Sequence, residues 1–162
     1  MVDVDRQMLG IYLNDHLALA TAAADLGERS HASNRDGALG ALLARLRDEL
    51  AAERETLLDV MQRLDVRRDR LKELAGWAGE KGGRLKLNGR LFSYSPMSRV
   101  TELDALTLLV SAERSLWRGL QAALGDDERL AGLDLPARAA AAEARLAAID
   151  DHRDAAVVTA MR

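Results

Sequence analysis

A long stripe of apolar residues at helical spacing runs through residues 36–65 and is interrupted once by an acid. Its apolar members are Leu39, Leu43, Leu46, Leu50, Leu57, Val60 and Leu64. Steps of three and four residues place these side chains on one face of an α-helix. Glu53 falls on the same face, where an unpaired charge would be strongly destabilising. The stripe therefore predicts a helix that packs against others and supplies its acid with a partner.

A second acid lies in equally apolar surroundings, in the segment from Pro96 to about Leu124. The residues three, four and seven positions before and after Glu113 are all apolar: Leu106, Leu109, Val110, Leu116, Trp117 and Leu120. Because residues at these spacings share a helix face, the Glu113 carboxylate points toward a core. Ser95-Pro96 is a suitable helix start, since proline is favoured in the first turn. Two such helices predict a polar cluster inside a bundle.

Two further segments have the pattern of helices with a histidine on or near the apolar face. Residues 4–30 carry His16 in the middle of that face, and the polar run after Gly27 predicts the helix end. A last helix over residues 136–161 carries His152 at the edge of its inward stripe. That stripe comprises Ala139, Ala142, Leu146, Ile149, Ala156 and Ala160. Alanine and leucine favour helices, and residues that favour strands are scarce.

The connection between the second and third helices is much longer than the other two. Its first part, residues 67–78, predicts a short amphipathic helix. Residues 84–92 alternate in polarity around Asn88-Gly89, which favours a β-hairpin, with an extended loop as the alternative. A long second connection makes the second and third helices parallel. We expect one all-α domain over residues 1–162, an up-down four-helix bundle with one long crossover.

The charge pattern and residue content exclude several classes of protein. A net charge of −3 gives no general attraction to nucleic acid, and the basic residues between positions 63 and 99 are interleaved with acids. Without cysteine there is no disulfide and no thiolate metal site. The sequence has no P-loop and no dinucleotide-binding glycine motif. Because the N-terminus lacks a secretory pattern and no long apolar run could span a membrane, we expect a cytoplasmic protein.

With these elements placed, the chain resembles the ferritin-like superfamily of four-helix bundles. The resemblance rests on Tyr12–Ala18 in the first helix and on Glu53, Glu113 and His152, and it covers nearly the whole chain. The opening motif and the crossover over residues 84–96 are similar to those of a bacterial branch of this superfamily. Di-metal members carry a glutamate on the first and third helices and a Glu-x-x-His pair on the second and fourth.

The resemblance implies a ligand set that is incomplete on the second and fourth helices. Glu53 corresponds to the second-helix glutamate, whereas Thr56 stands in the place of its histidine. His152 corresponds to the fourth-helix histidine, whereas Ile149 replaces its partner glutamate. These losses argue against di-iron oxidation and iron storage.

The resemblance implies one metal ligand on the first helix and one on the third. Glu113 matches the third-helix glutamate, and His16, or Asp15 beside it, takes the place of the first-helix glutamate. A metal site of His16, Glu53, Glu113 and His152 follows, with ligands that suit iron, manganese or zinc. The alternative is a metal-free network in which His16 bridges two carboxylates.

The first hypothesis for function is a ferritin-like protein with a degenerate metal site, more structural or interacting than catalytic. The alternative is a metal-dependent oxidoreductase or stress-response protein that uses iron or manganese at the His/Glu cluster. We expect a homodimer, because such bundles commonly assemble through helix faces and because residues 85–94 supply an apolar arm. We expect no membrane association.

Overall fold

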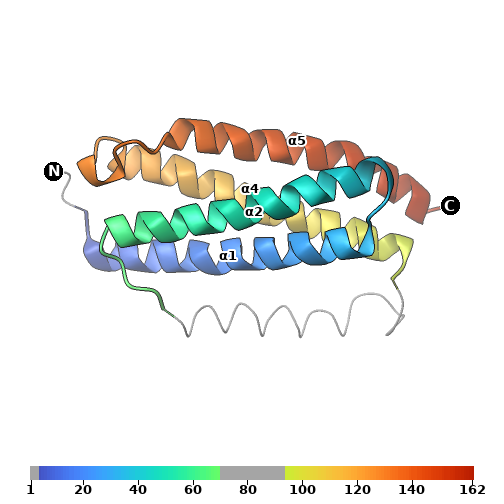
Figure 1. Cartoon of the computed structure of the whole chain (residues 1–162), viewed down its shortest axis with the longest axis horizontal. Helices are drawn as coiled ribbons and strands as arrows, with labels where there is room; N and C mark the ends of the chain where they lie inside the picture. Colours follow the sequence, from blue (N-terminus) through green and yellow to red (C-terminus); the bar gives the residue numbers. More distant parts are fainter. Residues whose placement is uncertain (1–3, 70–93) are drawn as a thin grey trace.

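The computed structural model describes residues 4–69 and 94–162, most of which are helical. The elements are α1 (Arg6–Ser33), α2 (Gly37–Arg63), α4 (Pro96–Leu124), the 3-10 helix η1 (Glu128–Leu130) and α5 (Leu135–Ala160) (Figure 1). The described residues contain no strand, and the expectation of an all-α protein with four main helices is confirmed. The short extra helix and the hairpin expected between residues 67 and 94 fall almost entirely outside the described residues.

Three of the four main helices begin at a side-chain cap, whereas Asp36 before α2 makes no capping hydrogen bond. The Asp5 carboxylate accepts hydrogen bonds from two backbone N–H groups of the first turn of α1. Ser95 and Ser98 form a capping box at the start of α4, with Pro96 in the first turn. The Asp134 carboxylate caps α5 in the same way. The predicted start at Ser95-Pro96 is confirmed.

The first helix is longer than the glycine at position 27 suggested. Residue 27 is buried in the interior of α1, and a Cβ there would lie 3.2 Å from Leu50 Cδ1 and 3.4 Å from the Cα of Arg47. Gly27 therefore allows α1 and α2 to approach closely and does not break the helix. The helix ends instead at Ser33 and is followed by the C-cap residue Asn34, whose backbone N–H donates to the carbonyl oxygen of His31.

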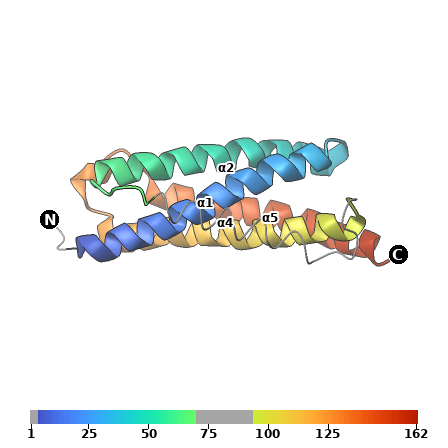
Figure 2. The same cartoon turned by 90° about the horizontal axis from the view of Figure 1, so that it is seen from below.

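The helices form two antiparallel hairpins that pack against each other. Figure 1 shows α1 with α2 and α4 with α5 as these hairpins, and α2 and α4 run in the same direction. The closest packing is within the hairpins and between α1 and α4, whereas α2 and α5 meet at few points. In the view of Figure 2, α1 lies between α2 and α4. No helix in the described part of the chain is long and apolar enough to cross a membrane.

The core consists of two separate apolar clusters, one toward each end of the bundle, and every main helix contributes to both. One cluster includes Leu26, Leu46, Leu106 and Ile149, and the other includes Leu17, Leu57, Leu120 and Leu135. Along α2 the first cluster ends at Leu50 and the second begins at Leu57. Glu53 lies between these two leucines. The apolar core is therefore interrupted near the middle of the bundle.

Candidate functional site

Charged side chains from three helices meet where the apolar core is interrupted. Glu53 comes from α2, Glu113 from α4 and Arg145 from α5. Their side chains are 13 %, 9 % and 7 % exposed, respectively. Glu53 and Glu113 each lie on their helix between a member of one apolar cluster and a member of the other, whereas Arg145 lies between Ala142 and Leu146 of the first cluster. We refer to these three residues, together with Glu49 and Arg138, as the charge layer.

Arg145 is the central residue of the charge layer. Its Nη2 donates a hydrogen bond to Oε1 of Glu113 and lies 3.6 Å from Oε1 of Glu53. Its Nη1 lies 3.4 Å from Oε2 of Glu49, one turn before Glu53 on α2. A single guanidinium thus contacts three carboxylates on two helices. Arginine suits this position because its planar fork presents several donors in fixed directions.

A second guanidinium closes one side of the charge layer. Arg138 Nη1 donates to Oε1 of Glu53 over 3.0 Å. The guanidinium carbon of Arg138 also lies 5.5 Å from the centre of the Trp117 ring, within the range of a cation–π contact. Trp117 is fully buried and follows Glu113 by one helical turn on α4. The layer therefore holds three carboxylates and two guanidiniums, and the partly exposed Glu49 has a further cation in Arg45, whose Nε lies 3.5 Å from Oε1 of Glu49.

The environment of Glu113 favours its protonated form. Burial and, less strongly, the charge of Glu53 raise the pKa of Glu113 to about 7, against the opposing effects of the Arg145 charge and of the nearby N–H groups of Arg145 and Trp117. Glu113 consequently holds a proton part of the time near neutral pH.

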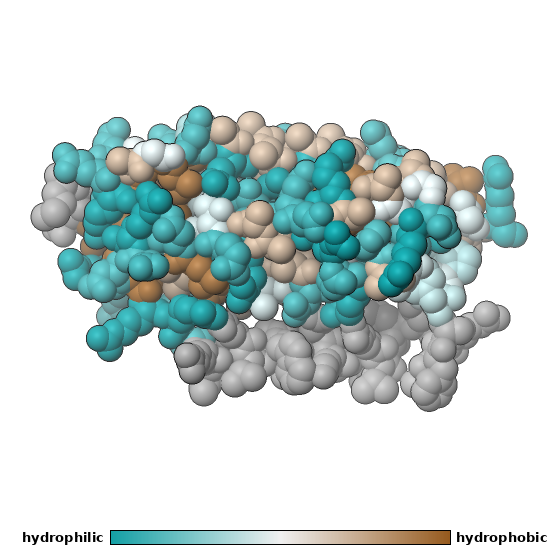
Figure 3. All heavy atoms as spheres, in the orientation of Figure 1, coloured by the Kyte–Doolittle hydropathy of each residue, from teal (hydrophilic) through white to brown (hydrophobic). Residues whose placement is uncertain are grey.

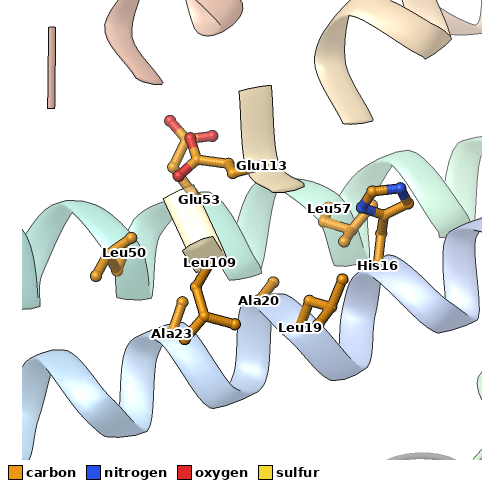
Figure 4. A pocket seen from close by; sticks show the side chains of 9 residues that line it. All are labelled: His16, Leu19, Ala20, Ala23, Leu50, Glu53, Leu57, Leu109 and Glu113. Atoms are coloured by element: carbon orange, nitrogen blue, oxygen red, sulfur yellow. The ribbon is translucent and has the colours of Figure 1, made fainter. Parts of the chain in front are cut away.

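The hydrogen bonding inside the charge layer is incomplete. Within the described residues, no partner reaches the buried atoms Glu53 Oε2, Glu113 Oε2, Arg145 Nε and Trp117 Nε1. Both glutamates line a cavity of about 20 Å³ between α1, α2 and α4, room for about one water molecule (Figure 4). The remaining lining is His16 and six apolar side chains: Leu19, Ala20, Ala23, Leu50, Leu57 and Leu109.

The structure brings together two of the four predicted metal ligands and places a third nearby. In Figure 4 the carboxylates of Glu53 and Glu113 lie next to each other, whereas His16 lies at the far side of the cavity. The His16 ring contacts the Tyr12 ring edge-on, with ring centres 4.5 Å apart. Burial lowers the pKa of His16, and the charge of Asp15 opposes this shift. The imidazole is therefore uncharged at neutral pH.

His152 does not belong to the charge layer. It is half buried on α5, roughly two turns beyond Arg145, and it is not among the residues that line the cavity. No group of three or more His, Cys, Asp or Glu side chains in the described ranges is arranged to hold a metal ion. The oxygens of Glu53 and Glu113 that face α5 already contact guanidiniums. These residues fit an arginine better than they fit a metal.

Arg145 and Arg138 are the residues that the sequence interpretation missed. Arg145 follows Ala142 by three residues and precedes Ile149 by four, so it lies on the predicted inward face of the last helix. An arginine on a buried stripe opposite two helices with buried acids is a signal for an ion pair.

Models of protein families, characterised proteins and solved structures give no match to this chain. The ferritin-like resemblance consequently rests on the residues of the sequence alone. What the chain does is inferred from the geometry of the charge layer.

Proposed function

We propose that this chain is a ferritin-like bundle with a degenerate metal site, in which Arg145 takes the place of the metal, and that it serves as a structural or interaction protein. The parallel course of α2 and α4 supports the ferritin-like assignment (Figure 1). The meeting of Glu53 from α2 with Glu113 from α4 supports it further, since di-metal members place glutamates there.

The observation that carries the proposal is the position of the Arg145 guanidinium between two buried glutamates. A metal would need both carboxylates deprotonated and free to coordinate. Here Arg145 contacts both of them, and Arg138 contacts Glu53 as well. An arginine keeps its proton in proteins and cannot itself be a ligand. A metal at this place would leave buried guanidiniums without their partners, at a large cost in free energy.

The size of the cavity argues against catalysis. General acid–base chemistry requires a substrate within hydrogen-bonding distance of the catalytic group. The space beside Glu113 holds about one water molecule and is lined mainly by apolar side chains. A buried polar layer of this kind serves instead to specify how helices pair.

Assembly as a homodimer is part of the same proposal, because ferritin-like bundles commonly pair through helix faces. On the face drawn in Figure 3 the described residues are largely hydrophilic, and the apolar ones form separate patches. Among the large apolar side chains of α1 and α4, Leu108 is the most exposed, at 72 %. It is the first residue to substitute when the subunit contact is sought.

A metal-loading experiment tests the proposal. The untagged protein is incubated with iron(II) without oxygen, with manganese(II) and with zinc(II), then desalted, and its bound metal and Tm are measured. We expect well below one equivalent of metal and an unchanged Tm, because the glutamates are engaged. One equivalent or more together with a raised Tm overturns the proposal.

Two variants make this experiment specific to the position of Arg145. We expect Arg145→Met to bind metal, because it removes the cation that Glu53 and Glu113 share and leaves only the Arg138 contact to Glu53. The matched control is Arg114→Met, since Arg114 pairs with Glu143 over 2.6 Å outside the charge layer. The control should bind no more metal than the wild type. A folded Arg145→Met protein that binds none contradicts the idea that Arg145 stands in the metal's place.

The alternative function is an iron- or manganese-dependent oxidoreductase. One observation favours it: His16 lines the same cavity as Glu53 and Glu113, so imidazole and carboxylate groups share one space. In this case the wild type binds metal, and His16→Ala lowers the amount bound. The loading experiment therefore separates the two functions.

A further inference from the structure

The carboxylates of Glu53 and Glu113 each bond an arginine through one oxygen and keep the other oxygen unbonded. Oε1 of Glu53 accepts from Arg138 over 3.0 Å, and Oε1 of Glu113 accepts from Arg145. Both Oε2 atoms are buried, and within the described residues no partner reaches either of them. A buried carboxylate oxygen without a hydrogen bond is destabilising. The charge layer therefore needs a further hydrogen-bonding partner for each Oε2 atom.

The two side chains with these unbonded oxygens line one small cavity between α1, α2 and α4. Its volume is about 20 Å³, and a water molecule needs about 10–15 Å³ of such space. A cavity with a purely apolar lining stays dry, whereas one with two or more polar partners holds water. Figure 4 shows the carboxylates of Glu53 and Glu113 next to each other beside this space. One molecule is therefore close to both.

The charges of the layer select an uncharged occupant. Three carboxylates meet three guanidiniums there: Glu49, Glu53 and Glu113 against Arg45, Arg138 and Arg145. An ammonium ion would add an unbalanced positive charge in a buried place, and an anion would meet two carboxylates. Water adds no charge. Because it both donates and accepts, water bonds a carboxylate and a protonated carboxyl equally well.

We propose that the charge layer binds one water molecule in this cavity, which bridges Oε2 of Glu53 and Oε2 of Glu113. The bridge joins α2 to α4, which are not among the closely packed helix pairs. Ordering one water costs less than leaving two buried oxygens unbonded. Arg145 then supplies the charge of a bridging metal, and the water supplies its second contact. The inference rests on the proposed function, because a metal would take the same oxygens.

A high-resolution crystal structure of the wild type tests this directly. The protein is purified without a tag, a chelator or ammonium. We expect one ordered water whose oxygen lies about 2.6–3.2 Å from both Oε2 atoms, and no anomalous signal at the iron, manganese or zinc edge. An empty cavity, or a water that contacts only one carboxylate, overturns the inference alone. An anomalous peak between the carboxylates overturns the proposed function as well.

Ammonium and water scatter X-rays almost alike, so a separate measurement distinguishes them. The Tm of the wild type is compared in ammonium chloride and in sodium chloride at the same concentration. We expect equal values, because water is the occupant in both salts. A Tm that is higher in ammonium chloride overturns water as the occupant, since a ligand that binds the folded state raises the Tm.

A pair of variants tests the site in solution. Oxygen-17 relaxation dispersion counts the water molecules that stay bound longer than the protein takes to tumble. Ala20 lines the cavity, and Ala20→Val adds two methyl groups there, so this variant should hold one such water fewer than the wild type. Ala24→Val is the matched control, because Ala24 lies one turn further along α1 and lines an open groove instead. Equal numbers in all three proteins contradict the inference.

Should Ala20→Val fail to fold, neutron diffraction from wild-type crystals grown in heavy water still decides, because it locates deuterons. We expect a deuteron on the line from the water oxygen to each of the two Oε2 atoms. This holds whether Glu113 is ionised or protonated, since the deuteron then belongs to the water or to the carboxyl. A line without a deuteron overturns the bridge.

Discussion

The charge layer and the two apolar clusters that flank it lie in one bundle and contribute in different ways. The clusters are built from side chains whose burial is favourable in almost any packed arrangement, because hydrophobic burial has no direction. The layer is directional, since Arg145 meets Glu53 and Glu113 in one alignment of the helices. A shift of α5 by one turn would bury three charges without partners.

Within one core, the two regions thus have different roles: one stabilises the fold, and the other specifies how the helices are arranged. The apolar clusters supply most of the free energy of folding, whereas the layer selects how the α1–α2 hairpin faces the α4–α5 hairpin. The layer achieves this with incomplete hydrogen bonding, as three of its buried atoms have no partner in the described residues. Partly satisfied buried networks are expected to be sensitive to small changes. The effects of substitutions in the two regions should therefore differ in their pH dependence.

The largest effect is expected from Arg145→Ala. It leaves Glu53 and Glu113 buried without their shared cation, which typically costs about 3–5 kcal/mol. Urea unfolding followed by circular dichroism measures this loss, and it should grow as the pH rises and the acids ionise. Arg114→Ala is the matched control, since its partner Glu143 is well exposed and the pair contributes at most about 1 kcal/mol. Equal losses in the two variants would contradict a special role for the layer.

A comparable loss with a different pH dependence is expected from Leu106→Ala. Leu106 is fully buried in one apolar cluster, and removing its side chain leaves a cavity that costs about 2–5 kcal/mol. Because no charge is exposed or buried by this change, the loss should be the same at acid and at mildly alkaline pH. The same urea experiment at both pH values decides the matter. A loss that follows the pH as in Arg145→Ala would mean that the two regions are not independent.

The same contrast explains how much the sequence could predict. Glu53 and Glu113 were found because an acid among leucines stands out against a regular helical period. Arg145 was not found, because α5 is rich in alanine on several sides, and its inward and outward faces are therefore hard to tell apart in the sequence. His152 was favoured by a motif, yet roughly two turns of helix separate it from the layer. The helical period of the sequence thus locates the buried acids. Which cation pairs with them depends on how the helices align in space, which the period does not give.

The smallest effect is expected at Asn14, a buried polar residue whose bonding is complete. Its side-chain amide donates to the carbonyl oxygens of Gly10 and Arg67 over 2.8 and 3.0 Å, and its oxygen accepts from the Asp69 N–H over 2.6 Å. Asn14→Ala removes all three bonds. Arg67 and Asp69 are exposed, so water can replace the lost partner.

We therefore expect Asn14→Ala to lower the free energy of unfolding by about 1–2 kcal/mol. The loss should not depend on pH, because the substitution neither removes a charged group nor changes the burial of one. Urea unfolding at two pH values provides the measurement. Asn14→Asp keeps the acceptor for the Asp69 N–H and loses the two donors, so it tests which bonds matter. A loss at Asn14 as large as that of Arg145→Ala would show that burial of a polar group, and not its charge, makes the layer sensitive.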